Sequence, residues 1–161
     1  MTSLQQEQND YFRLILMTVV GQAYAAAGFA LEEKPTQWAG GQFRFFKQLN
    51  KELYAFIAYQ HLPYPEPQPS RFRVTLARTD KLNPALSSRH PKFDRRTLSV
   101  LVVEDFGVNI LPMADYWWEY RTTEELGRAL AEAGHLVAGY GIPWLAGELT
   151  PPERQTAESA T

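Results

Sequence analysis

Residues 71–79 read RFRVTLART, the most regular alternation of apolar and polar side chains in the chain. Successive side chains of a β-strand point to opposite faces, so this pattern predicts a strand with one apolar and one polar face. The apolar face carries Phe72, Val74 and Leu76, and the polar face carries Arg71, Arg73, Thr75 and Thr79. We therefore expect a sheet that covers a core on one side and presents cations on the other.

Two aromatic-rich segments precede this strand. Residues 42–49 and 52–61 are joined by Asn50-Lys51, and so short a connection predicts an antiparallel hairpin. The second segment is apolar on both faces, which is typical of a central strand. Residues 62–70 place proline at every second position, and proline cannot donate a hydrogen bond to a neighbouring strand. That stretch is predicted to be an extended loop.

The segments that follow are less regular. Residues 80–96 form a polar, basic loop, and the apolar run at residues 97–106 predicts a fourth strand with two buried faces. Pro112 then interrupts the chain. Residues 116–120 are consistent with either a short edge strand or an extended aromatic segment.

Helices are predicted at both ends. Ser3 and Gln6 form a capping box for a helix over residues 3–27, and Gly28 suits its C-terminal cap. The apolar stripe of this helix is wider than one face, which indicates that the helix is covered on more than one side.

The C-terminal helix has an equally clear start. Thr122 and Glu125 form its capping box, and apolar residues then recur at helical spacing. We expect Gly139 or Gly141 to end the helix, because Pro143 should prevent its continuation.

These elements predict an α+β fold, with an antiparallel sheet of four to five strands and both helices packed on it. We assign residues 1–149 to a single domain and expect the polar residues 150–161 to be disordered. The apolar run at residues 14–20 is far shorter than the ~20 residues that cross a bilayer, so we expect no membrane association.

Composition excludes several kinds of site. The chain has 161 residues and no cysteine, so disulfides, thiolate metal sites and cysteine nucleophiles are ruled out. This composition suits a reducing compartment, and we expect a cytoplasmic protein. Its three histidines are widely spaced and match no metal-binding motif. We assign no catalytic residue, metal or cofactor.

Two weaker patterns leave chemistry open. Ser87-Ser88 lies close in sequence to His90, but nothing nearby orients this histidine as a catalytic triad requires. Glu104-Asp105 ends the predicted fourth strand, where one carboxylate is expected to point inward and pair with an arginine such as Arg44, Arg71 or Arg73. A carboxylate–arginine pair of this kind is the basis for an alternative hypothesis of an unrecognised enzyme site.

Positive charge is concentrated in one region. Residues 71–96 hold eight basic and two acidic residues, whereas residues 97–161 hold three basic and ten acidic. The first region offers an alternative anion-binding or nucleic-acid site formed by Arg71, Arg73, Arg78, Arg89, Lys92, Arg95 and Arg96. The net charge of −2 argues against a dedicated nucleic-acid-binding protein, and neutralisation of the basic region by the acidic one is the alternative interpretation.

Aromatic residues are concentrated in another region, Tyr116, Trp117, Trp118 and Tyr120. Tyrosine and tryptophan are enriched among the residues that dominate protein interfaces. In an extended segment Trp117 and Trp118 point in opposite directions, so one packs inward while the other is available to a partner.

Several short motifs together resemble a known family. Ala27-Gly28-Phe29 after the first helix, the Trp117-Trp118 pair and a helix closing in GIPWL (residues 141–145) are similar to the bacterial domain-of-unknown-function 4304 group. The resemblance implies an α+β fold and a bacterial origin. It implies no catalytic residue.

The leading hypothesis from sequence is a non-catalytic protein-interaction domain of the adaptor or immunity type, which binds a protein partner or a second copy of itself. Polyanion or nucleic-acid binding through the basic region is the first alternative. The second alternative is an enzyme with a carboxylate–arginine site.

Overall fold

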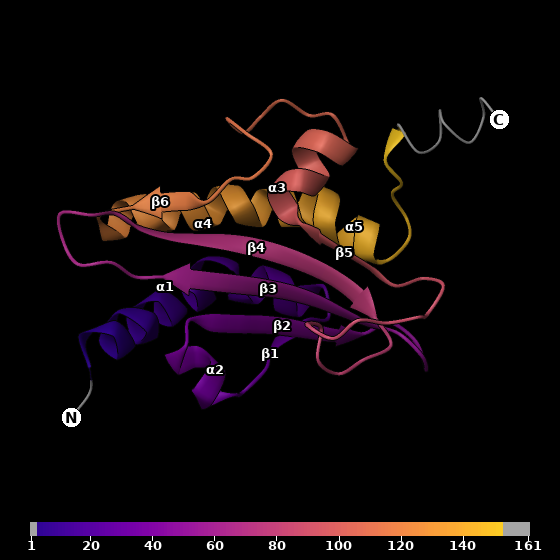
Figure 1. Cartoon of the computed structure of the whole chain (residues 1–161), viewed down its shortest axis with the longest axis horizontal. Coiled ribbons are helices and arrows are strands. Elements are labelled where there is room, and N and C mark those ends of the chain that lie inside the picture. The colour runs from indigo at the N-terminus through magenta and orange to yellow at the C-terminus, as the bar shows by residue number, and fades with distance from the viewer. Residues whose placement is uncertain (1–2, 153–161) are drawn as a thin grey trace.

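The computed structural model describes residues 3–152 and has an α+β architecture, with an antiparallel sheet between helices and loops (Figure 1). The strands follow the order β1-β2-β3-β4-β5, and β6 also pairs with β4. The strands are β1 (Ala30–Leu31), β2 (Gln42–Gln48), β3 (Tyr54–Leu62), β4 (Ser70–Thr79), β5 (Asp94–Thr97) and β6 (Trp118–Tyr120). The helices are α1 (Leu4–Ala26), α2 (Pro35–Ala39), α3 (Leu98–Val100), the π-helix η1 (Leu101–Asp105), α4 (Thr123–Leu136), the π-helix η2 (Val137–Gly141) and α5 (Ile142–Leu145).

The predicted hairpin and the alternating strand are confirmed. β2 pairs with β3 in antiparallel register, with Phe45 opposite Ile57, and β3 pairs with β4, with Ile57 opposite Leu76. These three side chains are buried on the face that the long helices cover. β3 is therefore the central strand that its two apolar faces predicted.

Both helix starts are also confirmed. The Ser3 hydroxyl accepts a hydrogen bond from the Gln6 N–H, and the Thr122 hydroxyl accepts one from the Glu125 N–H. α1 and α4 pack against each other as well as on the sheet, but Leu14 and Met17, which broaden the apolar stripe of α1, are 61% and 38% exposed, so the helix is covered less completely than the stripe predicted. Gly134 of α4 allows this close approach, because a Cβ there would lie 2.8 Å from Val20 Cγ1.

The predicted strand over residues 97–106 is wrong. β5 ends at Thr97, whose hydroxyl accepts a hydrogen bond from the Val100 N–H and so caps a helical segment. Leu98, Leu101 and Val102 are buried at helical spacing, a period that the continuous apolar run conceals.

The expected end of the last helix is also wrong. The chain passes through the wider π-turn of η2 and continues as α5, where Pro143 lies in the first turn. A first-turn residue needs no N–H, so proline is tolerated there. Trp144 and Leu145 fold back onto the core as a result.

Two further expectations concern the chain ends and the membrane. Of the tail predicted to be disordered, only Thr150–Pro152 fall within the described residues. Within residues 3–152, no helix has the length and hydropathy needed to cross a bilayer.

Candidate functional site

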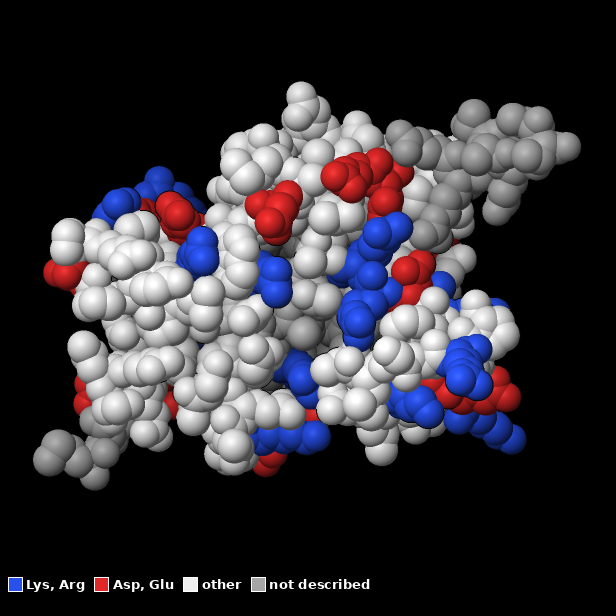
Figure 2. Space-filling model, viewed as in Figure 1, with Lys and Arg blue, Asp and Glu red and all other residues white. Residues whose placement is uncertain are grey.

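The two faces of the sheet differ in what covers them. The long helices α1 and α4 lie behind the strands in Figure 1 and bury one face. Strand register places a second set of side chains on the opposite face, which we call the open sheet face. Its members used below are Gln42, Arg44, Ala58, Gln60, Arg71, Arg73, Thr75, Ala77, Arg95 and Glu119. Figure 2 looks onto this face and shows Lys and Arg in a band over the central strands.

A pocket of about 260 Å³ lies on this face, and we call it the arginine pocket. Small side chains from β3 and β4 form its floor, namely Ala58, Thr75 and Ala77. Arg44 and Arg95 line it from opposite sides. One end is closed by Pro84-Ala85, which belong to the long loop between β4 and β5 (residues 80–93). None of the described residues that line it is acidic. The pocket therefore offers two cationic groups to an anion.

Hydrogen bonds position Arg95 of this pocket and the neighbouring Arg73. Arg95 Nη1 donates a hydrogen bond to the Pro84 carbonyl at 3.0 Å, and Arg73 Nε donates to Gln60 Oε1 at 3.1 Å. A guanidinium carries five N–H groups, so one such bond leaves donors for a ligand. Glu32 lies beside Arg44 at the sheet edge, but its carboxylate pairs with Lys34 at 3.2 Å.

Trp117 lies on the same face, between two arginines. The guanidinium carbons of Arg71 and Arg73 each lie 4.7 Å from the centre of its ring. A cation over an indole face is attracted by the negative potential of the ring, and the stacking restricts all three side chains. Trp117 therefore forms a half-buried aromatic ridge across the open sheet face.

A second pocket of about 410 Å³ lies beyond this ridge, and we call it the methionine pocket. Its lining joins apolar and charged groups: Arg71, Pro112, Met113, Asp115, Tyr116, Trp117 and Glu119. Met113 is 58% exposed, so it is available to a ligand. Unlike the arginine pocket, this one carries two carboxylates.

The structure separates the four aromatic residues proposed from sequence. Trp118 is buried and stacks on Phe72 at 5.5 Å, and Tyr116 packs edge-on against Trp118. Burial raises the pKa of Tyr116. Tyr120 lies on the helix side of the sheet and hydrogen-bonds to His61, and burial raises the pKa of its phenol to about 12. Of these four aromatic residues, Trp117 lies on the open sheet face, and Tyr116 lies at the edge of the methionine pocket.

The seven basic residues proposed from sequence are also separated. Arg71, Arg73 and Arg95 belong to the open sheet face. Arg78 donates to the carbonyls of Lys92, Trp144 and Leu145, which ties β4 to the C-terminal helix. Arg96 pairs with Asp105 at 3.2 Å. Arg89 and Lys92 are exposed on the long loop and do not line the arginine pocket.

Arg44 was missed as a site residue. It lies outside the basic region 71–96, between the buried Phe43 and Phe45 of β2. The alternation around it was sufficient to place it on the polar face of that strand.

The structure shows where the two carboxylates of the carboxylate–arginine hypothesis, Glu104 and Asp105, lie. Asp105 is paired with Arg96, whereas Glu104 is exposed. The pair links η1 to β5, and its partner differs from the three arginines considered from sequence. In residues 3–152, no three His, Asp or Glu side chains are grouped closely enough to hold a metal ion.

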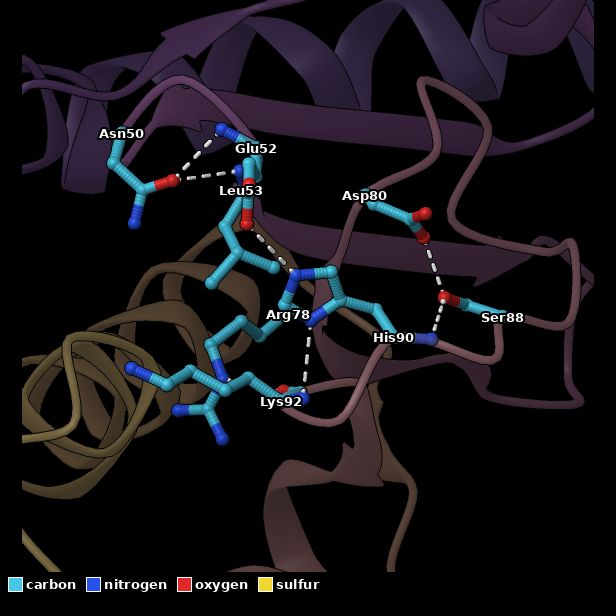
Figure 3. Close-up of polar contacts among 8 residues, drawn as sticks. All are labelled: Asn50, Glu52, Leu53, Arg78, Asp80, Ser88, His90 and Lys92. Carbon is cyan, nitrogen blue, oxygen red and sulfur yellow. Dashed lines mark hydrogen bonds and ion pairs between the residues drawn. The ribbon is translucent and has the colours of Figure 1, made fainter.

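The long loop is organised by hydrogen bonds that Figure 3 shows. The Ser88 hydroxyl donates to Asp80 and accepts from the backbone N–H of His90. The His90 ring instead accepts from the Lys92 N–H through Nδ1, and its Nε2 lies 3.2 Å from a Glu52 carboxylate oxygen. The hydrogen bond from Ser88 lowers the pKa of Asp80. Ser88 and His90 thus stabilise the loop that closes one end of the arginine pocket.

Comparisons with known proteins return no match: no family model, no curated protein and no solved structure is significantly similar to the chain. The resemblance to the domain-of-unknown-function 4304 group therefore stays a prediction from sequence.

Proposed function

We propose that this chain is a non-catalytic protein-interaction domain whose open sheet face binds an extended segment of another protein. One observation carries the proposal: a sheet face that the long helices leave uncovered holds two pockets, and one of them is lined by a tryptophan that two arginines stack against. Tryptophan and arginine are enriched among the residues that dominate binding energy at interfaces.

The polar groups elsewhere support a binding role. Asp105, Ser88 and His90 have structural partners in the fold. His61 is buried beneath α1, where its ring stacks on Phe12 at 4.1 Å. These contacts account for the polar groups without a substrate.

Polyanion binding is a second candidate function, because the arginine pocket presents two cations and no lining carboxylate. The methionine pocket weighs against a uniformly charged ligand, since Asp115 and Glu119 would repel a continuous phosphate backbone. A polypeptide, whose charge varies from residue to residue, suits the whole face better.

The test is selection of peptides from a random display library on the purified chain, followed by affinity measurement with labelled peptides. We expect Arg73→Glu and Trp117→Ala each to weaken binding by about tenfold or more, which corresponds to ~1.4 kcal/mol. Arg128→Glu is the matched control, because this exposed side chain lies on α4 behind the sheet. Selected peptides that bind all three variants as well as the wild type would show that another surface is used.

A labelled single-stranded oligonucleotide distinguishes the second candidate. Tight binding that falls steeply with salt and is lost in an Arg44→Glu/Arg95→Glu variant would favour polyanion binding over the proposed function. Light scattering identifies the case in which the partner is a second copy, since Trp117→Ala would then convert a dimer to a monomer. We further propose a cytoplasmic location, on the absence of cysteine alone.

A further inference from the structure

Charge is segregated along the open sheet face. The arginine pocket has Arg44 and Arg95 at its sides, whereas the methionine pocket has two carboxylates, Asp115 and Glu119, beside Arg71 and apolar Met113. A ligand that satisfies both pockets must therefore be anionic at one end and apolar, neutral or cationic at the other.

The distance between the two pockets can be estimated along β4, because both pockets touch this strand. The arginine pocket touches this strand at Thr75 and Ala77, and the methionine pocket touches it at Arg71. Along β4, four to six strand residues separate these points, roughly 14–20 Å at about 3.4 Å per residue, while the rest of the methionine pocket's lining lies beside the strand, at residues 112–119. An extended peptide that runs along β4 has the same rise, so its two anchoring side chains are four to six residues apart.

The alternation of side chains narrows the possible number of residues between the two anchors. Successive side chains of an extended segment alternate in direction, so two anchors that both face the sheet are separated by an even number of residues. Separations of four and six satisfy this condition, whereas five turns one anchor away from the sheet.

Resting on the proposed function, we propose that the bound segment is an extended peptide with a carboxylate side chain in the arginine pocket and an apolar side chain in the methionine pocket, four or six residues apart. Arg44 and Arg95 supply charge-assisted hydrogen bonds to the carboxylate. Met113 and Trp117 supply an adaptable apolar surface for the second anchor. Between the anchors the peptide crosses the Trp117 ridge.

Synthetic peptides of serine and threonine test this arrangement directly. Each peptide carries one glutamate and one leucine at positions that differ by three, four, five or six, in both orders. Binding is followed by fluorescence anisotropy. We expect the separations of four and six, in one order, to bind at least about fivefold more tightly than three and five. Replacing the glutamate with glutamine should weaken binding by about tenfold.

A charge exchange gives the sharpest control. The Arg44→Glu/Arg95→Glu variant should lose the glutamate peptide and gain affinity for the matching lysine peptide. An Arg44→Gln/Arg95→Gln variant serves in its place if the charge reversal impairs folding; it should bind the glutamate and glutamine peptides equally.

The outcomes separate this inference from the function on which it rests. Peptides whose binding needs Trp117 but shows no preference for glutamate or for even separation would overturn the inference and leave the function intact. If neither these peptides nor the display library yields a ligand that Trp117→Ala weakens, both fail. Preference for an oligonucleotide at the same arginines would also overturn the inference.

Discussion

The guanidinium carbon of Arg73 lies 4.7 Å from the centre of the Trp117 ring on the open sheet face. The side chain of the next residue, Trp118, points to the opposite face of the sheet and stacks on Phe72. Two neighbouring tryptophans therefore serve different purposes, one at the surface and one in the core.

Substitution of the two tryptophans should separate stability from binding. Trp118→Ala removes a buried ring and should lower the free energy of unfolding by ~3–5 kcal/mol. Trp117→Ala removes partly exposed stacking and should cost about 1–2 kcal/mol, because each cation–π contact contributes ~0.5–1 kcal/mol. Urea unfolding of both variants measures the difference. Equal losses would mean that Trp117 also belongs to the core.

A buried pair of tyrosines gives a second prediction. The hydroxyls of Tyr24 and Tyr59 lie 2.6 Å apart in the core, and burial raises the pKa of both phenols. Tyr24→Phe or Tyr59→Phe leaves one buried hydroxyl without this partner and should cost ~1–3 kcal/mol.

The double variant tests whether the pair is coupled. Removing both hydroxyls leaves no polar group unpaired, so Tyr24→Phe/Tyr59→Phe should cost less than the sum of the single substitutions. Urea unfolding of the four proteins gives this coupling free energy. Simple additivity would show that each hydroxyl is satisfied independently of the other.

Local sequence predicted the parts of the fold that depend on period and capping. Alternation placed the side chains of residues 71–79 on their correct faces, although Thr79, expected on the solvated face, is buried. Capping boxes located both long helices. The segment after β5 was predicted wrongly because a short, fully buried helix and a buried strand are both continuous apolar runs. The end of the last helix failed for another reason. The π-turn of η2 brings Pro143 into a first-turn position, which local rules do not anticipate.

The candidate site was predictable only in part. Arg71, Arg73 and Trp117 were nominated from local patterns, whereas Arg44 contributes through strand register 29 residues before Arg73. Which cations stay available depends on tertiary partners. Arg78 and Arg96 resemble the others in sequence, yet carbonyl groups and Asp105 engage them in the fold.

Two glycines of α4 provide a matched pair for the third prediction. Gly134→Ala would bring its Cβ to 2.8 Å from Val20 Cγ1, on a stiff β-branched side chain between α1 and α4. Gly127→Ala meets no atom within 4 Å. Alanine is ~1 kcal/mol better than glycine inside a helix, so Gly127→Ala should stabilise the protein. Gly134→Ala should destabilise it by ~1–3 kcal/mol through overpacking. Thermal unfolding distinguishes the two, and a higher Tm for Gly134→Ala would refute the close packing of these helices.

The fourth prediction concerns pH and the buried His61. Asn9 Nδ2 donates to the Ala39 carbonyl, so Asn9 Oδ1 faces the imidazole and accepts from His61 Nδ1 at 2.7 Å. His61 Nε2 then accepts from the Tyr120 hydroxyl at 2.5 Å. Both ring nitrogens are occupied in the neutral form. Burial lowers the pKa of His61 to about 3.

Protonation should therefore oppose folding. The unfolded chain takes up a proton at His61 below about pH 6.5, while the native protein stays neutral there until about pH 3. The stability that the neutral ring contributes is complete above pH 6.5 and decreases as the pH falls toward 3, by up to ~1.4 kcal/mol per pH unit. Urea unfolding between pH 7 and pH 4.5 should give a shallower slope for His61→Gln than for the wild type. His135→Gln is the control, because His135 is an exposed histidine at the end of α4. Equal slopes for His61→Gln and the wild type would show that His61 takes up its proton as readily in the fold as in the unfolded chain.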